Sequence, residues 1–275
     1  MKRRKTGLWR TLTVVFVLLT AFSVASSSVA NTYAALINAT LGIETSRMVK
    51  VSGAENEDTQ YFKSAYRSLE EEYQAKAALI RQIGQEGTIL LKNEHQALPM
   101  KQGSILVLGG SKFMHALAHG GGSMNAADLA NATTVEQALA YDGLQVMTEG
   151  SSADAALVVI GRSAGEGADM PEGGLILTSD ELALIDQAKA ASERVIVLLS
   201  GDFYPEVAAL QSDPEIDAIL HLGNAGYRGA YGLADVITGK ASPSGRTVET
   251  VATESHVSAA SQNYGDHTYT NASKI

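Results

Sequence analysis

The stretch AALVVIGRSAGEGADMPEGGLILT, residues 155–178, decides the fold. Its apolar run at 156–160 is typical of a strand that is buried on both faces, as in a parallel sheet. A glycine-rich loop follows at the carboxyl end of this strand, where ligands bind in open α/β sheets. Loops of this length in compact domains are usually functional or disordered. The polar residues available for chemistry are Arg162, Ser163, Glu166, Asp169 and Glu172.

Outward from this loop, short apolar runs alternate with helical patterns. We expect an extended segment at 88–91 and strands at 105–108, 144–147, 156–160, 195–199 and 218–222. We expect helices at 59–85, 134–140, 179–191, 205–210 and 229–238. Gly87 should end the first of these helices and Gly239 the last. Ser179 should cap the helix at 179–191, and Pro205 lies in the first turn of the helix at 205–210. This alternation predicts an α/β fold, a three-layer α/β/α sandwich with a mostly parallel sheet.

Composition excludes several classes of function. A net charge of −9 argues against a nucleic-acid partner, which requires clustered Lys and Arg. The absence of cysteine excludes disulfides and thiolate chemistry, and it suits an exported bacterial protein. The six histidines have no metal-binding spacing, so we expect neither a metal nor a cofactor.

The amino terminus predicts a membrane-directing helix ahead of the sandwich. Basic residues precede an uncharged, mostly apolar stretch that extends to Ile37. It is long enough for a single-pass anchor in the cell membrane, and it also fits a signal peptide cleaved near Ala30. Both alternatives place the rest of the chain outside the cell. We expect an anchor or signal segment at 1–37, a linker at 38–60, the sandwich domain at 61–250 and an irregular, truncated tail at 251–275.

Two chemistries are possible in the loop at 163–172. Residues 161–165 form a G-x-S-x-G pentapeptide around Ser163, and residues 119–122 match the HGGG motif of esterases. A serine nucleophile needs a helix directly after it, however, and the sequence EGADMPEGG at 166–174 does not favour one. The alternative uses Glu166, whose carboxyl between two glycines can donate a proton if its surroundings raise its pKa.

Four motifs in order resemble the α/β sandwich domain of glycoside hydrolase family 3, the β-glucosidase family. EGTILLKNE at 86–94 with Leu98-Pro99 resembles the family's entry strand, and HGGGSM at 119–124 resembles its GGTGSG loop. IGRSAGEGAD at 160–169 is similar to the SGEGxDR loop, and residues 223–250 resemble the glycine-rich ending. The resemblance extends from about Tyr61 to Thr250, and the helix ahead of it resembles members in which the barrel follows the sandwich.

The resemblance implies a role for three residues. Glu166 has the position of the acid/base carboxylate, Ser123 that of a serine which contacts the sugar, and Asp169 that of the loop aspartate. Two departures affect the site, because Met170 replaces the family's arginine and Met124 replaces a glycine.

The family's (β/α)8 barrel, which carries the aspartate nucleophile, has no counterpart in the sequence. A barrel takes about 250 residues by itself. We therefore expect part of a retaining β-glycosidase that acts on terminal β-linked sugars and is inactive as an isolated chain. The alternative is a non-catalytic surface module that binds carbohydrate, or a decayed fragment.

Overall fold

The computed structural model describes residues 4–41, 64–113, 132–162, 173–248, 250–251 and 253–254. The chain divides into two units, Met1–Ser64 and Ala65–Ile275. The division falls close to the predicted start of the sandwich domain at residue 61.

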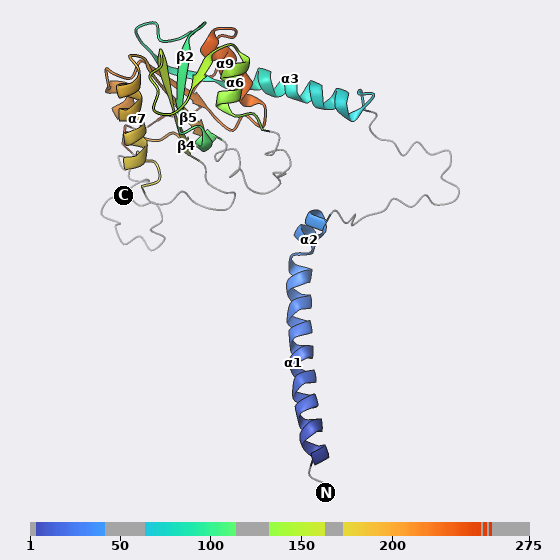
Figure 1. The fold of residues 1–275 in the computed structure, drawn as a ribbon. Coiled ribbons are helices and arrows are strands. Elements are labelled where there is room, and N and C mark those ends of the chain that lie inside the picture. Colours follow the sequence, from blue (N-terminus) through green and yellow to red (C-terminus); the bar gives the residue numbers. More distant parts are fainter. Residues whose placement is uncertain are drawn as a thin grey trace. The chain divides into compact units, whose positions relative to one another are not determined.

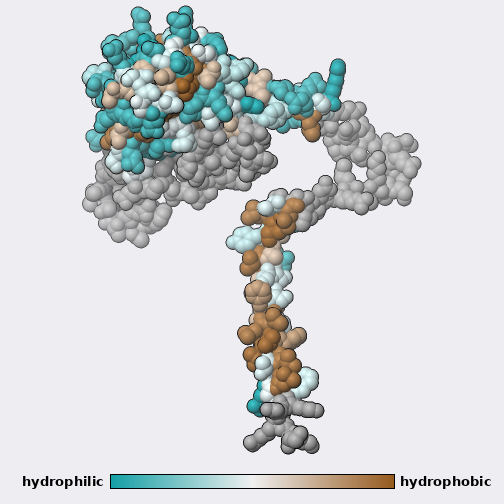
Figure 2. All heavy atoms as spheres, in the orientation of Figure 1, coloured by the Kyte–Doolittle hydropathy of each residue, from teal (hydrophilic) through white to brown (hydrophobic). Residues whose placement is uncertain are grey.

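The first unit consists of two helices, α1 (Arg4–Thr32) and α2 (Ala34–Leu41). Within α1, the segment Gly7–Thr32 is long and apolar enough to cross a membrane, although a signal sequence would also meet this test. Apolar side chains are exposed along the helix, and Figure 2 shows them as hydrophobic patches between residues of intermediate hydropathy. Thr11, Thr13 and Thr20 donate their hydroxyl protons to carbonyls one turn earlier, which satisfies these polar groups inside the helix. The predicted linker at 38–60 overlaps α2 at its start, and residues 42–60 lie outside the described residues.

The second unit is built on a six-stranded sheet in the order β1-β6-β5-β4-β2-β3. The strands are β1 (Ile89–Asn93), β2 (Ser104–Leu108), β3 (Gln145–Met147), β4 (Ala155–Arg162), β5 (Val195–Gly201) and β6 (Ala218–Leu222). All neighbours are parallel except β1, which pairs antiparallel with β6. The predicted mostly parallel sheet is confirmed.

Helices cover both faces of the sheet, as Figure 1 shows. On one face α6 (Val135–Tyr141) and α9 (Gly229–Thr238) pack over an apolar cluster that includes Leu157 and Leu198. On the other face α7 (Ser179–Ala191) and α8 (Ala208–Ser212) pack over a cluster that includes Val158 and Val197. Because successive residues of β4 and β5 point to opposite faces, these uninterrupted apolar strands supply both clusters. The predicted three-layer sandwich is therefore confirmed.

Helix α3 (Leu69–Gly87) packs directly against α9 through three glycines. A Cβ atom on Gly84 would lie 2.6 Å from the carbonyl oxygen of Gly229 and 3.2 Å from the Cα of Gly232, so the two backbones are in contact. Arg81 of α3 reaches across this contact and donates two hydrogen bonds of 2.6 Å to the carboxylate of Asp235 on α9. The side chain of Asp235 is 2% exposed and that of Arg81 is 30% exposed, so the ion pair is partly buried, with the carboxylate largely removed from water.

Several predicted helix boundaries were wrong. Helix α3 begins at Leu69 rather than at Thr59, because Ser68 caps it by accepting a hydrogen bond from the Glu71 amide. Gly87 is its last residue, and it lacks the left-handed conformation of a stop glycine. The cap of α7 is Thr178 rather than Ser179. Helix α8 begins at Ala208, so Pro205 precedes it. Helix α9 has the predicted bounds, and Gly239 ends it with a φ of 80°.

Candidate functional site

The strand order places a topological switch point between β2 and β4. After β2 the chain moves to β3 on one side, and it then returns to β4 on the other side and continues outward through β5 and β6. Strands β2 and β4 are parallel neighbours, so their carboxyl ends lie at the same edge of the sheet; Leu108, the last residue of β2, pairs with Val158, and β4 continues for four more residues to Arg162. Ligands in open α/β sheets bind in the crevice that such a reversal creates. The candidate site is therefore the edge at which β2 and β4 end.

The loops that the sequence singled out leave the sheet from these two strands. The HGGGSM segment at 119–124 follows β2, and the segment SAGEGAD at 163–169 follows β4. Ser123, Ser163, Glu166 and Asp169 themselves lie outside the described residues, so their roles stay predictions.

The chain after β2 lies against the end of β4. A Cβ atom on Gly161 would lie only 2.7 Å from the carbonyl oxygen of Lys112, so glycine is required for this close approach. The turn after β2 is closed by hydrogen bonds from the Lys112 and Phe113 amides to the carbonyls of Gly109 and Gly110. The two loops thus start from backbone segments in van der Waals contact.

Arg162, the last residue of β4, precedes the stretch 163–172 and is hydrogen-bonded to residues that follow it. Its Nε donates to the carbonyl oxygen of Gly174 at 2.7 Å, and one terminal nitrogen donates to that of Ile176 at 3.1 Å. The two terminal nitrogens also bind the two carboxylate oxygens of Glu181 on α7. The Arg162 side chain is 10% exposed and that of Glu181 is 1% exposed, so water competes little for these bonds.

Glu181 remains a carboxylate in spite of its burial. Burial would raise its pKa, but hydrogen bonds from Arg162 and from the Thr178 amide, together with the charge of Arg162, lower the pKa to about 2. Lys112 adds a second positive charge, with its Nζ 3.8 Å from the carboxylate. Glu181 is also the third residue of α7, where it completes a capping box with Thr178. The charge pair is therefore joined to the start of a helix that packs on the sheet.

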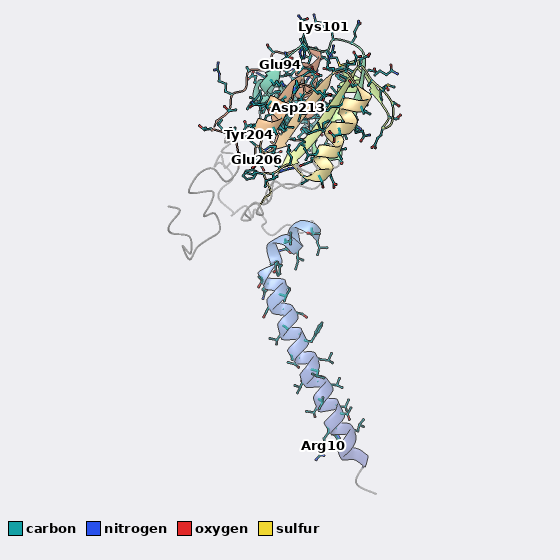
Figure 3. All side chains as sticks on the ribbon, turned by 90° about the vertical axis from the view of Figure 1, so that its left-hand side faces the viewer. Arg10, Glu94, Lys101, Tyr204, Glu206 and Asp213 are labelled. Carbon is teal, nitrogen blue, oxygen red and sulfur yellow. The ribbon has the colours of Figure 1, made fainter. Side chains whose placement is uncertain are left out.

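The loop after β5 is attached to the same site. The Asp202 amide donates to the carbonyl of Arg162 at 3.0 Å, and the Glu206 amide donates to that of Leu175 at 2.9 Å. Figure 3 shows Tyr204 and Glu206 close together at one end of the domain, with Lys101, which precedes β2, toward the opposite end.

The ring of Tyr204 stacks on His221 near the end of β6, with centroids 4.1 Å apart. His221 is 7% exposed, and its ring nitrogens have no hydrogen-bond partner of good geometry among the residues that the structure describes. Burial lowers the pKa of His221, and the nearby Gly201 backbone offsets this decrease only in part. The imidazole is therefore neutral at pH 7.

A hollow of about 690 Å³ lies at the opposite edge of the sheet from the candidate site. Of the charged groups that line it, Lys189 pairs with Glu215 at 3.4 Å and His95 hydrogen-bonds to Asp217 at 2.9 Å. Asp217 also accepts a hydrogen bond from the Val195 amide. Within the described ranges, no cluster of three or more His, Asp or Glu residues could hold a metal ion here or elsewhere.

Residues 88–274 match the model of the glycosyl hydrolase family 3 C-terminal domain. The chain belongs to glycosyl hydrolase family 3. The predicted resemblance is thus confirmed, and the match begins at the residue before β1.

Curated relatives of this chain include a β-glucosidase of Ruminococcus albus, which is 27% identical over 119 residues. A probable exo-1,4-β-xylosidase of Aspergillus fumigatus is 35% identical over 71 residues. These matches cover 42% and 26% of this chain but only 12% and 9% of the relatives. The chain therefore spans a small part of the family 3 enzymes that it matches.

Solved family 3 structures share the fold. A β-glucosidase from Paenibacillus barengoltzii superposes with a TM-score of 0.60 at 23% identity, over 69% of this chain and 25% of that one. β-Glucosidase 3B from Thermotoga neapolitana, in complex with α-D-glucose, superposes with a TM-score of 0.56 at 25% identity, over 68% of this chain and 32% of that one.

Sequence reasoning missed the pairing of Arg162 with Glu181. The spacing Thr178-x-x-Glu181 is a capping-box signal, and it identifies Thr178 as the cap. No local signal indicates that Glu181 also binds an arginine 19 residues earlier.

Proposed function

We propose that this chain supplies the acid/base half of a retaining β-glycosidase site. The observation that carries the proposal is the origin of the two predicted loops, which leave the sheet from β2 and β4 on either side of the switch point. Membership of glycosyl hydrolase family 3 supports a hydrolase that acts on glycosidic bonds.

In this proposal Glu166 protonates the glycosidic oxygen as the leaving group departs and then activates the water that releases the sugar. Ser123 and Asp169 contact the sugar from the two loops. A retaining mechanism needs a second carboxyl group about 5–5.5 Å from the first, to act as the nucleophile. That group would come from a (β/α)8 barrel outside these 275 residues. The chain alone would bind sugar without turning it over.

The substrates that we propose are terminal β-linked glucose or xylose. The curated relatives are named β-glucosidase and exo-1,4-β-xylosidase, and they do not distinguish the two sugars. We further propose that α1 is a membrane anchor with the sandwich domain on the outer face, and that cleavage near Ala30 would give a secreted form.

The test is to sequence the gene beyond codon 275 and to assay the product of the complete reading frame on aryl β-glucosides and β-xylosides. General acid–base catalysis contributes about 10²–10⁴-fold, so Glu166→Gln should lower turnover of a phenyl glycoside by about that factor. Ser163→Ala, three residues away on the same loop, is the matched control and should remain active.

In a parallel assay on an aryl ester, loss of ester cleavage in Ser163→Ala with retention in Glu166→Gln would favour the esterase alternative. A complete product that contains a barrel and binds sugar, yet turns over no glycoside, would favour the non-catalytic binding module.

A further inference from the structure

The Arg162 side chain uses every N–H donor that a guanidinium has. Besides its bonds to Gly174, Ile176 and Glu181, one terminal nitrogen donates to the carbonyl oxygen of Gly161 at 3.1 Å. A planar fork can satisfy all these acceptors at once, whereas the compact ammonium of lysine cannot. The bonds reach three consecutive parts of the chain, namely the end of β4, residues 174–176 and the start of α7.

The partner carboxylate is itself held firmly. Glu181 accepts a hydrogen bond from the Thr178 amide at 2.9 Å, and Thr178 accepts one from the Glu181 amide. Helix α7 buries Ile185 and Ala188 against the sheet, so Glu181 does not move independently of the core. We call the pair Arg162 and Glu181 the loop clamp, because Arg162 precedes residues 163–172 and is bonded to the chain that follows them.

We propose that the loop clamp positions the proton-donating carboxyl of Glu166. This inference rests on the proposed function. Arg162 and residues 174–176, which flank the segment that contains Glu166, are bound to one another. Joining the two flanks of a segment in this way lowers the entropic cost of ordering the residues between them. A catalytic group misplaced by about 1 Å loses about 10²-fold in rate, so proton donation should depend on the clamp. Arg162 and Glu181 are positioning residues, since neither is assigned contact with the sugar.

The test compares substrates that differ in their need for a proton. The phenolate of a phenyl β-glycoside leaves poorly without protonation, while 2,4-dinitrophenolate leaves unaided. Arg162→Lys keeps the charge and removes the fork. Its matched control is Arg194→Lys at the amino end of β5, on the opposite edge of the sheet. Glu181→Gln keeps the shape of the partner and serves as a second variant if Arg162→Lys does not fold.

In the product of the complete reading frame, Arg162→Lys should lower kcat/KM for the phenyl glycoside by about 10–100-fold and for the dinitrophenyl glycoside by less than about 3-fold. Arg194→Lys should change neither value. An equal loss on both substrates would mean a merely structural role and would overturn the inference. A Glu166→Gln variant without leaving-group dependence would instead refute the proposed function, whatever the clamp variants do.

Hydrogen exchange on the 275-residue chain tests the clamp without turnover. Arg162→Lys should speed exchange of the amides at 163–177 by about tenfold or more, while β4 and β5 keep their wild-type rates. Unchanged exchange at 163–177 would show that the ends of the loop do not depend on Arg162.

Discussion

Replacing Gly84 by alanine should separate α3 from α9. The added Cβ would lie 2.6 Å from the Gly229 carbonyl oxygen, whereas ordinary contact begins at 3.4 Å, so one helix must move by about 0.8 Å. The obstructing atoms are backbone, which a rotamer change cannot relieve. The displacement also stretches the bonds from Arg81 to Asp235 across the same contact.

Opposing terms set the size of the effect. Alanine is favoured over glycine in a helix interior by about 1 kcal/mol. Overpacking costs about 1–3 kcal/mol, and loosening a buried ion pair adds to that cost, since losing one partner outright costs about 3–5 kcal/mol. We expect Gly84→Ala to lower the free energy of unfolding by about 2 kcal/mol.

Gly87→Ala is the control on the same helix. No atom lies within 4 Å of its added Cβ, and its φ is not positive, so we expect a change between zero and about 0.5 kcal/mol of stabilisation. Urea unfolding is best followed by near-ultraviolet circular dichroism of the tyrosines. The single tryptophan, Trp9, is in α1 and does not report on the sandwich. Equal stability of the two variants would refute the close contact between α3 and α9.

Three further predictions concern pH and a helix end. The folded-state pKa of Glu181 is below its usual value of 4.5, so its pairing with Arg162 stabilises the domain above that pH and is lost as the pH falls toward about 2. Glu181→Gln should therefore lose about 3 kcal/mol in urea unfolding at pH 7, with the difference from wild type shrinking at acidic pH. His221 resists protonation when folded, so the domain should lose stability as the pH falls below about 6.5, by at most about 1.4 kcal/mol per pH unit. His221→Leu should flatten this part of the pH profile, and an unchanged profile would mean that His221 takes up a proton as readily in the folded chain as in the unfolded chain. Gly239→Ala should lower the thermal midpoint by several degrees, because the residue has a φ of 80° and its Cβ would lie 2.6 Å from that of Pro99. A wild-type midpoint would contradict that strained helix end.

The fold could be predicted from local pattern because its strands are buried on both faces. The apolar runs of β4, β5 and β6 have no polar alternation, and this directly indicates a parallel sheet between helices. Gly239 fixed the end of α9 because only a residue that tolerates positive φ ends a helix in this way. The span of α7 was predicted correctly, but its cap was placed one residue late, since Thr178 and Ser179 are both good caps and only the hydrogen bonds of Glu181 distinguish them.

The candidate site was predictable only in part. Glycine-rich loops after apolar strands indicate where chemistry belongs, but the strand order that makes β2 and β4 neighbours is a long-range property. The loop clamp depends on a contact between Arg162 and Glu181, which meet only after α7 has packed on the sheet. Ser123, Glu166 and Asp169 stay predictions because they lie outside the described residues.

The two outer strands of the sheet have a consequence for how the domain behaves at high concentration. An outer strand with unpaired backbone groups can recruit a strand from another molecule and start aggregation. Strand β3 has only three residues, which offers little length for such recruitment. Strand β1 is interrupted by an irregularity between Leu90 and Lys92, and Lys92 points inward to the carbonyls of Gln211 and Asp213. Short length, a bulge and an inward charge all oppose association between sheet edges, so crowded copies of this domain should not join strand to strand through β1 or β3.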